Sequence, residues 1–155
     1  MEKYCIYIVL TRMNTTIARL IRIIKKDDFT HAAISLDKQL KYMYSFGRKY
    51  TYIPFVGRFI KEDINKKAYK FGKTLYGAVI EIEVSRQQYD KVRTLLDCFI
   101  SNDKLYKYNF KGLLYNLLGK PACREYRFLC SEFVYHIIKE SGITDCGKPR
   151  NLVRP

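Results

Sequence analysis

The chain has 155 residues, of which 48% are hydrophobic and 28% charged, a composition that predicts one folded domain over residues 1–155. Lys and Arg outnumber Asp and Glu by 29 to 15, so the formal net charge is +14 and partners such as nucleic acid, anionic lipid or an acidic polymer remain open. Five cysteines without C-x-x-C spacing exclude the common zinc frameworks, and their odd number argues against a complete disulfide framework.

Helix-like and strand-like patterns follow one another along the chain and indicate an α+β fold. Four residues separate two of the strand-like runs, a hairpin length, so these strands should pair antiparallel. The stretch 47–72 contains Pro54 and Gly57 with little periodicity, which predicts a long surface loop, with a short helix or an edge strand inside it as the alternative. In chain order the patterns predict a strand at 4–11, a helix at 15–25, strands at 31–36, 41–46 and 76–84, and helices at 85–100, 109–118 and 130–142.

Cys130 begins the last predicted helix and is the most informative residue of the chain. Phe133, Val134, Ile137 and Ile138 follow it at i+3, i+4, i+7 and i+8, which is the apolar face of a core-packed helix. A cysteine in the first turn lies beside unpaired backbone N–H groups and the positive end of the helix dipole, and both stabilise a thiolate. Cys130 is therefore a candidate nucleophile, although a buried cysteine also serves as a small apolar residue.

Two histidines are available as a base for this thiol. His136 lies about 120° around the same helix from Cys130, so we expect it to point away toward the surface. His31 opens a predicted strand after a loop-like segment, a position from which its ring can face a helix terminus. His31 is therefore the candidate partner of Cys130.

Two segments carry a resemblance to a known family. The run Cys-Ser-Glu-Phe-Val at 130–134 and the strand Thr-His-Ala-Ala-Ile at 30–34 resemble the circularly permuted branch of the NlpC-type, papain-like cysteine hydrolases. Histidine precedes cysteine here, as in that branch, which includes relatives similar to lecithin:retinol acyltransferase. The resemblance spans nearly the whole chain and implies an antiparallel sheet packed against helices.

The resemblance implies covalent catalysis in which Cys130 attacks a carbonyl carbon and His31 shuttles the proton. The backbone N–H of Cys130 is the expected first oxyanion donor, Tyr126 is the candidate second donor, and Tyr44 is a further candidate for substrate contact. Relatives usually orient the histidine with Glu, His or Asn on the following strand, and this chain departs from that pattern. Period-two alternation puts Ser45 and Tyr44 on opposite faces of that strand, and we expect Ser45 to orient His31.

Other charged residues have simpler explanations. Glu132 is interpreted as a first-turn acid that complements the helix dipole, although membership of the site is the alternative. Arg48, Arg58 and Lys61 are interpreted as solvated surface charges rather than as an anion site.

The sequence thus predicts a cysteine peptidase or amidase that needs no cofactor or metal and acts on a peptide, amide or acyl-lipid substrate. A thiol acyltransferase and a weakly active or inactive basic module for nucleic acid or anionic membrane are the alternatives. The apolar part of residues 1–10 is too short for a signal peptide, and no window approaches the roughly 20 apolar residues of a membrane span, so we expect a cytoplasmic protein.

Overall fold

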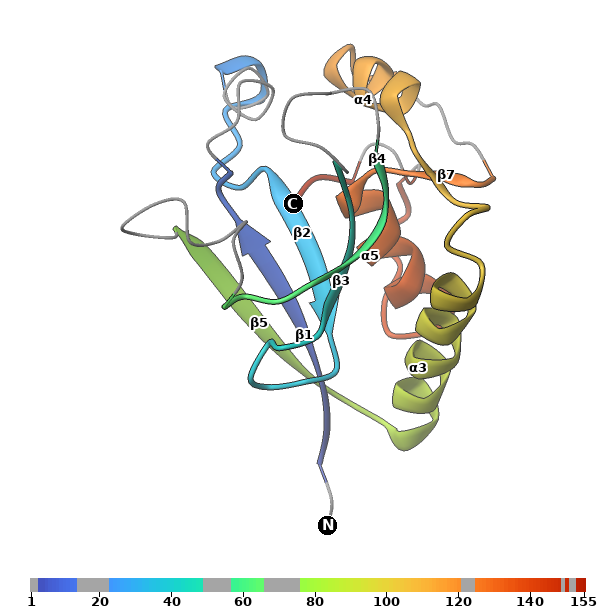
Figure 1. The fold of residues 1–155 in the computed structure, drawn as a ribbon. Helices are drawn as coiled ribbons and strands as arrows, with labels where there is room; N and C mark the ends of the chain where they lie inside the picture. The colour runs from blue at the N-terminus through green and yellow to red at the C-terminus, as the bar shows by residue number, and fades with distance from the viewer. Residues whose placement is uncertain are drawn as a thin grey trace.

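The computed structural model describes residues 3–13, 23–48, 57–65, 76–120, 125–148, 150 and 153–155. One seven-stranded sheet runs through it in the order β5-β1-β2-β3-β4-β6-β7, with helices packed beside it (Figure 1). The strands are β1 Tyr4–Thr11, β2 His31–Ser35, β3 Met43–Arg48, β4 Gly57–Glu62, β5 Gly77–Val84, β6 Lys107–Tyr108 and β7 Arg127–Phe128, and the helices are α3 Arg86–Ser101, α4 Phe110–Leu117 and α5 Cys130–Glu140. These elements confirm an α+β fold.

Most of the predicted elements are confirmed near their expected bounds. β2 and β3 pair antiparallel, with Ile34 opposite Tyr44, and the backbone N–H of Leu40 closes their connection on the Asp37 carbonyl. Ser85 caps α3, because its hydroxyl accepts from the Gln88 N–H while the Gln88 side chain accepts from the Ser85 N–H. Of the helix predicted at 15–25, residues 23–25 are helical, and its predicted start lies outside the described residues.

Within the stretch 47–72, predicted as a long loop, β4 occupies Gly57–Glu62, so the alternative of a strand inside it is correct for these residues. β4 pairs antiparallel with β3 along its whole length, and Phe59 points into the core. At Gly57 the neighbouring strand comes so close that an added Cβ would lie 2.5 Å from the Cβ of Tyr108. The glycine that suggested a loop therefore permits close approach of β4 and β6.

The main core lies between the sheet and the helices α3 and α5. Phe46, Phe59, Phe99, Phe128 and Phe133 meet there, with ring centroids of contacting pairs 5.0 to 6.1 Å apart. A second cluster on the other side of the sheet contains Tyr7, Val9, Ala33, Leu40 and Met43. Both faces of the sheet are therefore covered at β2 and β3, so polar side chains on these strands are buried. Within the described ranges, every helix is too short or too polar to cross a membrane.

Candidate functional site

Cys130 is the first residue of α5 and is only 8% exposed. The helix is fixed by Phe133 and Ile137, which are fully buried in the core against the sheet. Leu129 occupies the N-cap position and has no polar side chain, so no side chain at this position caps the first turn. Backbone N–H groups of that turn are thus left beside the thiol, where they can bind a negative charge.

Glu132 supports the start of this helix from inside the protein. Its carboxylate accepts the Leu129 N–H at 2.7 Å and the Asn109 side-chain amide at 3.2 and 3.3 Å. Asn109 in turn accepts the Gly112 N–H of α4 at 2.9 Å. Burial raises the pKa of Glu132, and the hydrogen bonds from Leu129 and Asn109 oppose that rise. Glu132 is therefore in the first turn of α5, as expected, and it also forms a fully buried connection between α4 and α5.

His31 opens β2 opposite Thr11 of β1 and is 8% exposed. Its Nε2 lies 3.0 Å from one carboxylate oxygen of Glu62 and 3.3 Å from the other. Burial by itself lowers the pKa of His31, but the charge of Glu62 and hydrogen bonds with Cys130 and Glu62 outweigh it, so the pKa lies well above its usual value. The imidazole thus lies between a thiol and a carboxylate.

Glu62 ends β4, and the preceding strand holds its carboxylate in place. The Ser45 hydroxyl of β3 donates a hydrogen bond to the Glu62 oxygen that lies nearer to His31. Ser45 is fully buried, and its register partner on β4 is Ile60, so it reaches Glu62 diagonally across the strand pair. Ser45, expected to orient His31 itself, therefore contacts the residue that does so.

The structure places the two candidate tyrosines elsewhere. Tyr44 lies on the face of β3 opposite to Ser45, where its ring stacks on Phe59 at 6.0 Å. Burial raises its pKa, and the nearby carboxylate of Asp97 on α3 adds to that effect. Tyr126 is 46% exposed, its carbonyl accepts the Lys107 N–H of β6, and its ring lies 6.2 Å from that of Tyr106. The described contacts of both tyrosines are therefore with the core and with β6, and not with Cys130 or His31.

His136 was expected at the surface, and that expectation is wrong. The residue is half-buried, with its ring centroid 5.3 Å from that of Phe128 and 6.0 Å from that of Phe99. Burial lowers its pKa, and the positive charge of Arg150 lowers it further. A neutral imidazole packed between aromatic rings has a role in the core, which leaves His31 as the histidine beside Cys130.

Glu62 is the residue of the site that sequence analysis missed. The signal was present in Arg-Phe-Ile-Lys-Glu at 58–62, a run of strand length that holds adjacent aromatic and β-branched residues and ends in a carboxylate. The surrounding Pro54 and Gly57 concealed it. Such a run, placed after the predicted His31 hairpin, was a candidate third strand with an acid at its end.

The arrangement orders a thiol, an imidazole and a carboxylate in series, with a serine hydroxyl on the carboxylate. A thiol beside an imidazole of raised pKa can give up its proton to the ring, and a carboxylate on the far nitrogen stabilises the imidazolium that forms. Among the described residues there is no group of three or more His, Cys, Asp or Glu side chains that could hold a metal ion. Comparison of the chain with family models, curated proteins and solved structures finds no match.

Proposed function

We propose that the protein is a cysteine hydrolase that cleaves an amide or ester bond through Cys130, His31 and Glu62. The observation that carries this proposal is the position of His31, which hydrogen-bonds the Glu62 carboxylate at 3.0 Å and has its pKa raised, despite burial, by Glu62 as well as by the nearby Cys130 thiol. A buried polar group needs a hydrogen-bond partner, but other polar groups could serve a buried imidazole equally well. Burial alone therefore does not explain why both a thiol and a carboxylate lie beside this ring. A nucleophile, a base and an orienting acid in one chain of contacts make up the minimum for covalent acyl chemistry.

The proposed reaction begins with transfer of the Cys130 proton to His31. Because Glu62 occupies Nε2 and a carboxylate only accepts hydrogen bonds, neutral His31 carries its proton on Nε2 and presents the Nδ1 lone pair. The proton passes to Nδ1 first, which gives a thiolate beside an imidazolium, and the thiolate sulfur then bonds to the carbonyl carbon while the carbonyl oxygen becomes the oxyanion. His31 then gives that proton to the leaving amine or alcohol, which produces a thioester on Cys130 and a neutral ring.

Hydrolysis of the thioester completes the cycle. His31 takes a proton from water, the hydroxide adds to the thioester carbon, and the departing sulfur recovers the proton from His31. The backbone N–H of Cys130 is the proposed donor to the oxyanion in both steps, since α5 begins there without a side-chain cap. Glu62 keeps its negative charge throughout and stabilises the imidazolium.

We further propose that the chain is a permuted papain-like domain of the NlpC type. The order of the site along the chain supports this assignment, with His31 on an early strand and Cys130 at the start of a late helix. The antiparallel pairing of β2, β3 and β4, which positions His31, Ser45 and Glu62, supports it as well.

Alkylation of Cys130 tests the proposal without knowledge of the substrate. Iodoacetamide labelling is followed by peptide mass spectrometry at pH 6, where a free thiol of pKa about 8.5 is almost entirely protonated. The exposed Cys98 and Cys146 are internal references in the same tube. We expect Cys130 to react at least about tenfold faster than either reference despite its burial, and to lose that advantage in His31→Ala.

The opposite result rejects the hydrolase. If Cys130 in the native chain reacts no faster than Cys98 and Cys146, the thiol is not activated and the residue is a small core side chain. If Cys130 reacts faster than Cys98 and Cys146 by the same factor in the native chain and in His31→Ala, the helix terminus activates the thiol. That result would exclude His31 as the base.

A further inference from the structure

The helix α4 exposes apolar side chains to solvent. Leu114, Tyr115 and Leu118 are 59%, 43% and 64% exposed, and we call these three residues the α4 stripe. Asn109, directly before α4, joins this helix to α5, because its side chain accepts the N–H of the buried Gly112 and donates to the buried Glu132. These contacts hold the start of α4 in place while the stripe faces solvent.

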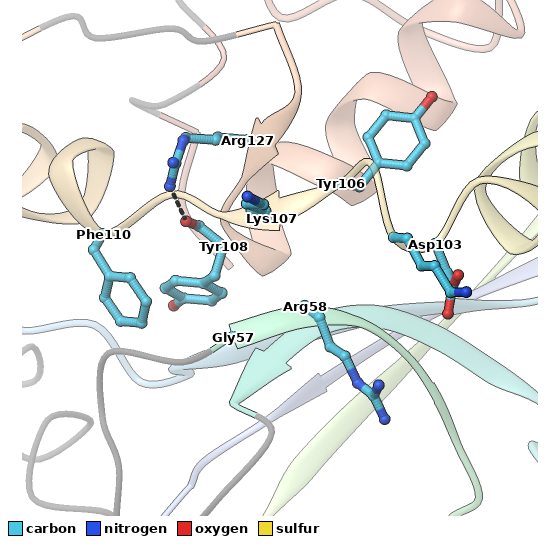
Figure 2. Close-up of a pocket in the computed structure, with 9 residues that line it drawn as sticks. Gly57, Arg58, Asp103, Tyr106, Lys107, Tyr108, Phe110 and Arg127 are labelled. Carbon is cyan, nitrogen blue, oxygen red and sulfur yellow. Dashed lines mark hydrogen bonds between the residues drawn. The ribbon is translucent and has the colours of Figure 1, made fainter.

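The stripe continues toward a pocket at the start of α4. Phe110, Leu114 and Leu118 follow one another at four-residue spacing, so they lie along one side of the helix. Phe110 lines a pocket of about 370 Å³ that we call the basic pocket (Figure 2). The pocket is lined by Gly57, Arg58, Asp103, Lys104, Tyr106, Lys107, Tyr108, Phe110 and Arg127.

Positive charge dominates the lining of the basic pocket. It contains four cationic side chains and one acid, Asp103. Arg127 donates to the Tyr108 carbonyl at 3.4 Å, whereas Arg58, Lys104 and Lys107 are exposed and make no ion pair with any described residue. The rings of Tyr108 and Phe110 lie 4.6 Å apart at one side of the pocket. Cations without an ion pair to any described residue therefore line the pocket at which the apolar side of α4 begins.

We propose that the α4 stripe and the basic pocket together form a docking surface for an anionic phospholipid bilayer. The cations would contact lipid phosphates while the two leucines enter the boundary with the acyl chains, and amphipathic surfaces bind membranes in this way. Nucleic acid would use the cations and the aromatic rings, but it would gain nothing from exposed leucines. The formal charge of +14 adds long-range attraction toward a negatively charged surface.

The docking surface does not depend on the chemistry proposed for Cys130. Its residues come from β4, β6, β7, α4, the connection between α3 and β6, and Leu118 directly after α4, and none of them is His31, Glu62 or Cys130. A variant Cys130→Ala therefore keeps the surface and removes the proposed nucleophile, so membrane binding can be measured without lipid turnover. Failure of docking would leave the hydrolase proposal intact, and failure of the hydrolase proposal would leave docking intact.

Vesicle sedimentation of the full chain carrying Cys130→Ala tests the proposal. Vesicles of phosphatidylcholine alone are compared with vesicles that contain phosphatidylglycerol as well, at low and at high salt. We expect binding to the anionic vesicles and at least about tenfold weaker binding for Leu114→Glu with Leu118→Glu. Leu114→Ser with Leu118→Ser should weaken binding too, which separates loss of apolar surface from added charge. Arg58→Gln with Lys107→Gln should weaken binding about fivefold per residue at low salt.

The matched control is Val79→Glu with Ile100→Glu. These residues are 51% and 44% exposed on β5 and α3, and the double substitution changes the net charge by the same amount as the double glutamate variant of α4. Retained binding by this control supports the proposal. Equal binding by the native and the α4 variants, or no binding of the native chain to anionic vesicles, overturns it. If the chain binds single-stranded RNA in a salt-sensitive manner and does not bind the vesicles, the proposal is also overturned. The positive charge would then serve nucleic-acid binding.

Discussion

Glu62 approaches His31 across an intervening strand. The two residues belong to β4 and β2, and β3 pairs with both, yet their side chains lie 3.0 Å apart. Ser45 of β3 lies between these strands and donates to the same Glu62 oxygen. Twist of the sheet thus lets three neighbouring strands converge on one imidazole, and the proposed site depends on their register.

Glu62→Gln should reduce the alkylation rate of Cys130 and any hydrolytic turnover strongly. The amide keeps the size of the carboxylate but removes the charge that stabilises the imidazolium, and it can turn its NH2 toward Nε2 and so favour the wrong tautomer. We expect a loss on the order of 10²- to 10⁴-fold in turnover. Glu83→Gln, which removes an exposed carboxylate paired with Lys3 on β5, should leave both rates unchanged. Unchanged rates in Glu62→Gln would remove Glu62 from the mechanism.

Ser45→Ala should have a smaller effect that acts through Glu62. The hydroxyl contacts the carboxylate and is fully buried, so its loss leaves one oxygen of Glu62 with a hydrogen bond fewer. A hydrogen bond to a charged group contributes about 1.5–3 kcal/mol, and we expect about a tenfold reduction in alkylation rate. Ser45→Thr restores a hydroxyl and should recover part of the rate. In Glu62→Gln, addition of Ser45→Ala should cause little further loss, and additive losses would show that Ser45 acts independently of Glu62.

Much of the scaffold could be predicted from periodicity. The helix around Cys130 and the antiparallel hairpin that begins with His31 follow from local patterns, because their apolar residues repeat at helical or strand spacing. β4 could not be recognised in the same way. Its inward Phe59 is followed directly by Ile60, so the run lacks the alternation of a half-buried strand, and both faces of the sheet there are partly covered.

The contacts of the site depend on tertiary structure, and this explains the incomplete prediction. Face alternation correctly separates Ser45 from Tyr44, but it does not reveal that Ser45 binds a carboxylate on the next strand. The position of His136 depends on where Phe99 of α3 and Phe128 of β7 pack against α5, which no local pattern contains. Residue type and helix position indicated Cys130 and His31 as candidates, whereas the proposed third member, Glu62, depends on the order of the strands in the sheet.

Stability should depend on pH through His31. The pKa of His31 lies well above its usual value in the folded protein, despite the opposing effect of burial, because of the charge of Glu62 and hydrogen bonds with Cys130 and Glu62. In the unfolded chain it returns to about 6.5. The stabilisation is therefore fully present below pH 6.5, while Glu62 stays ionised, and is lost as pH rises through the raised pKa of the folded state. Urea unfolding measures the free energy of unfolding of the native chain and of Glu62→Gln at pH 6 and at pH 9. The difference between the two proteins should be larger at pH 6.

The comparison needs a carboxylate that does not contact His31. Glu83→Gln provides it, since Glu83 pairs with Lys3 and both side chains are exposed. The free energy of unfolding of Glu83→Gln should differ little from that of the native chain, and by the same amount at pH 6 and pH 9. A gap for Glu62→Gln that is equal at both pH values, or wider at pH 9, would contradict a charged His31 stabilised by Glu62.

Glu132→Ala should destabilise the protein by about 2–4 kcal/mol, because the substitution leaves a cavity and removes the acceptor for the Leu129 N–H and the Asn109 amide. Glu132→Gln keeps the size of the side chain and one acceptor oxygen, so it should cost less than Glu132→Ala, although its NH2 group has only donors beside it. Chemical denaturation near pH 7 measures both free energies of unfolding.

The alkylation rate of Cys130 in folded Glu132→Gln should stay close to that of the native chain, because Glu132 contacts the helix start and not the thiol. Strong loss of alkylation in that variant, with stability retained, would place Glu132 in the chemistry instead.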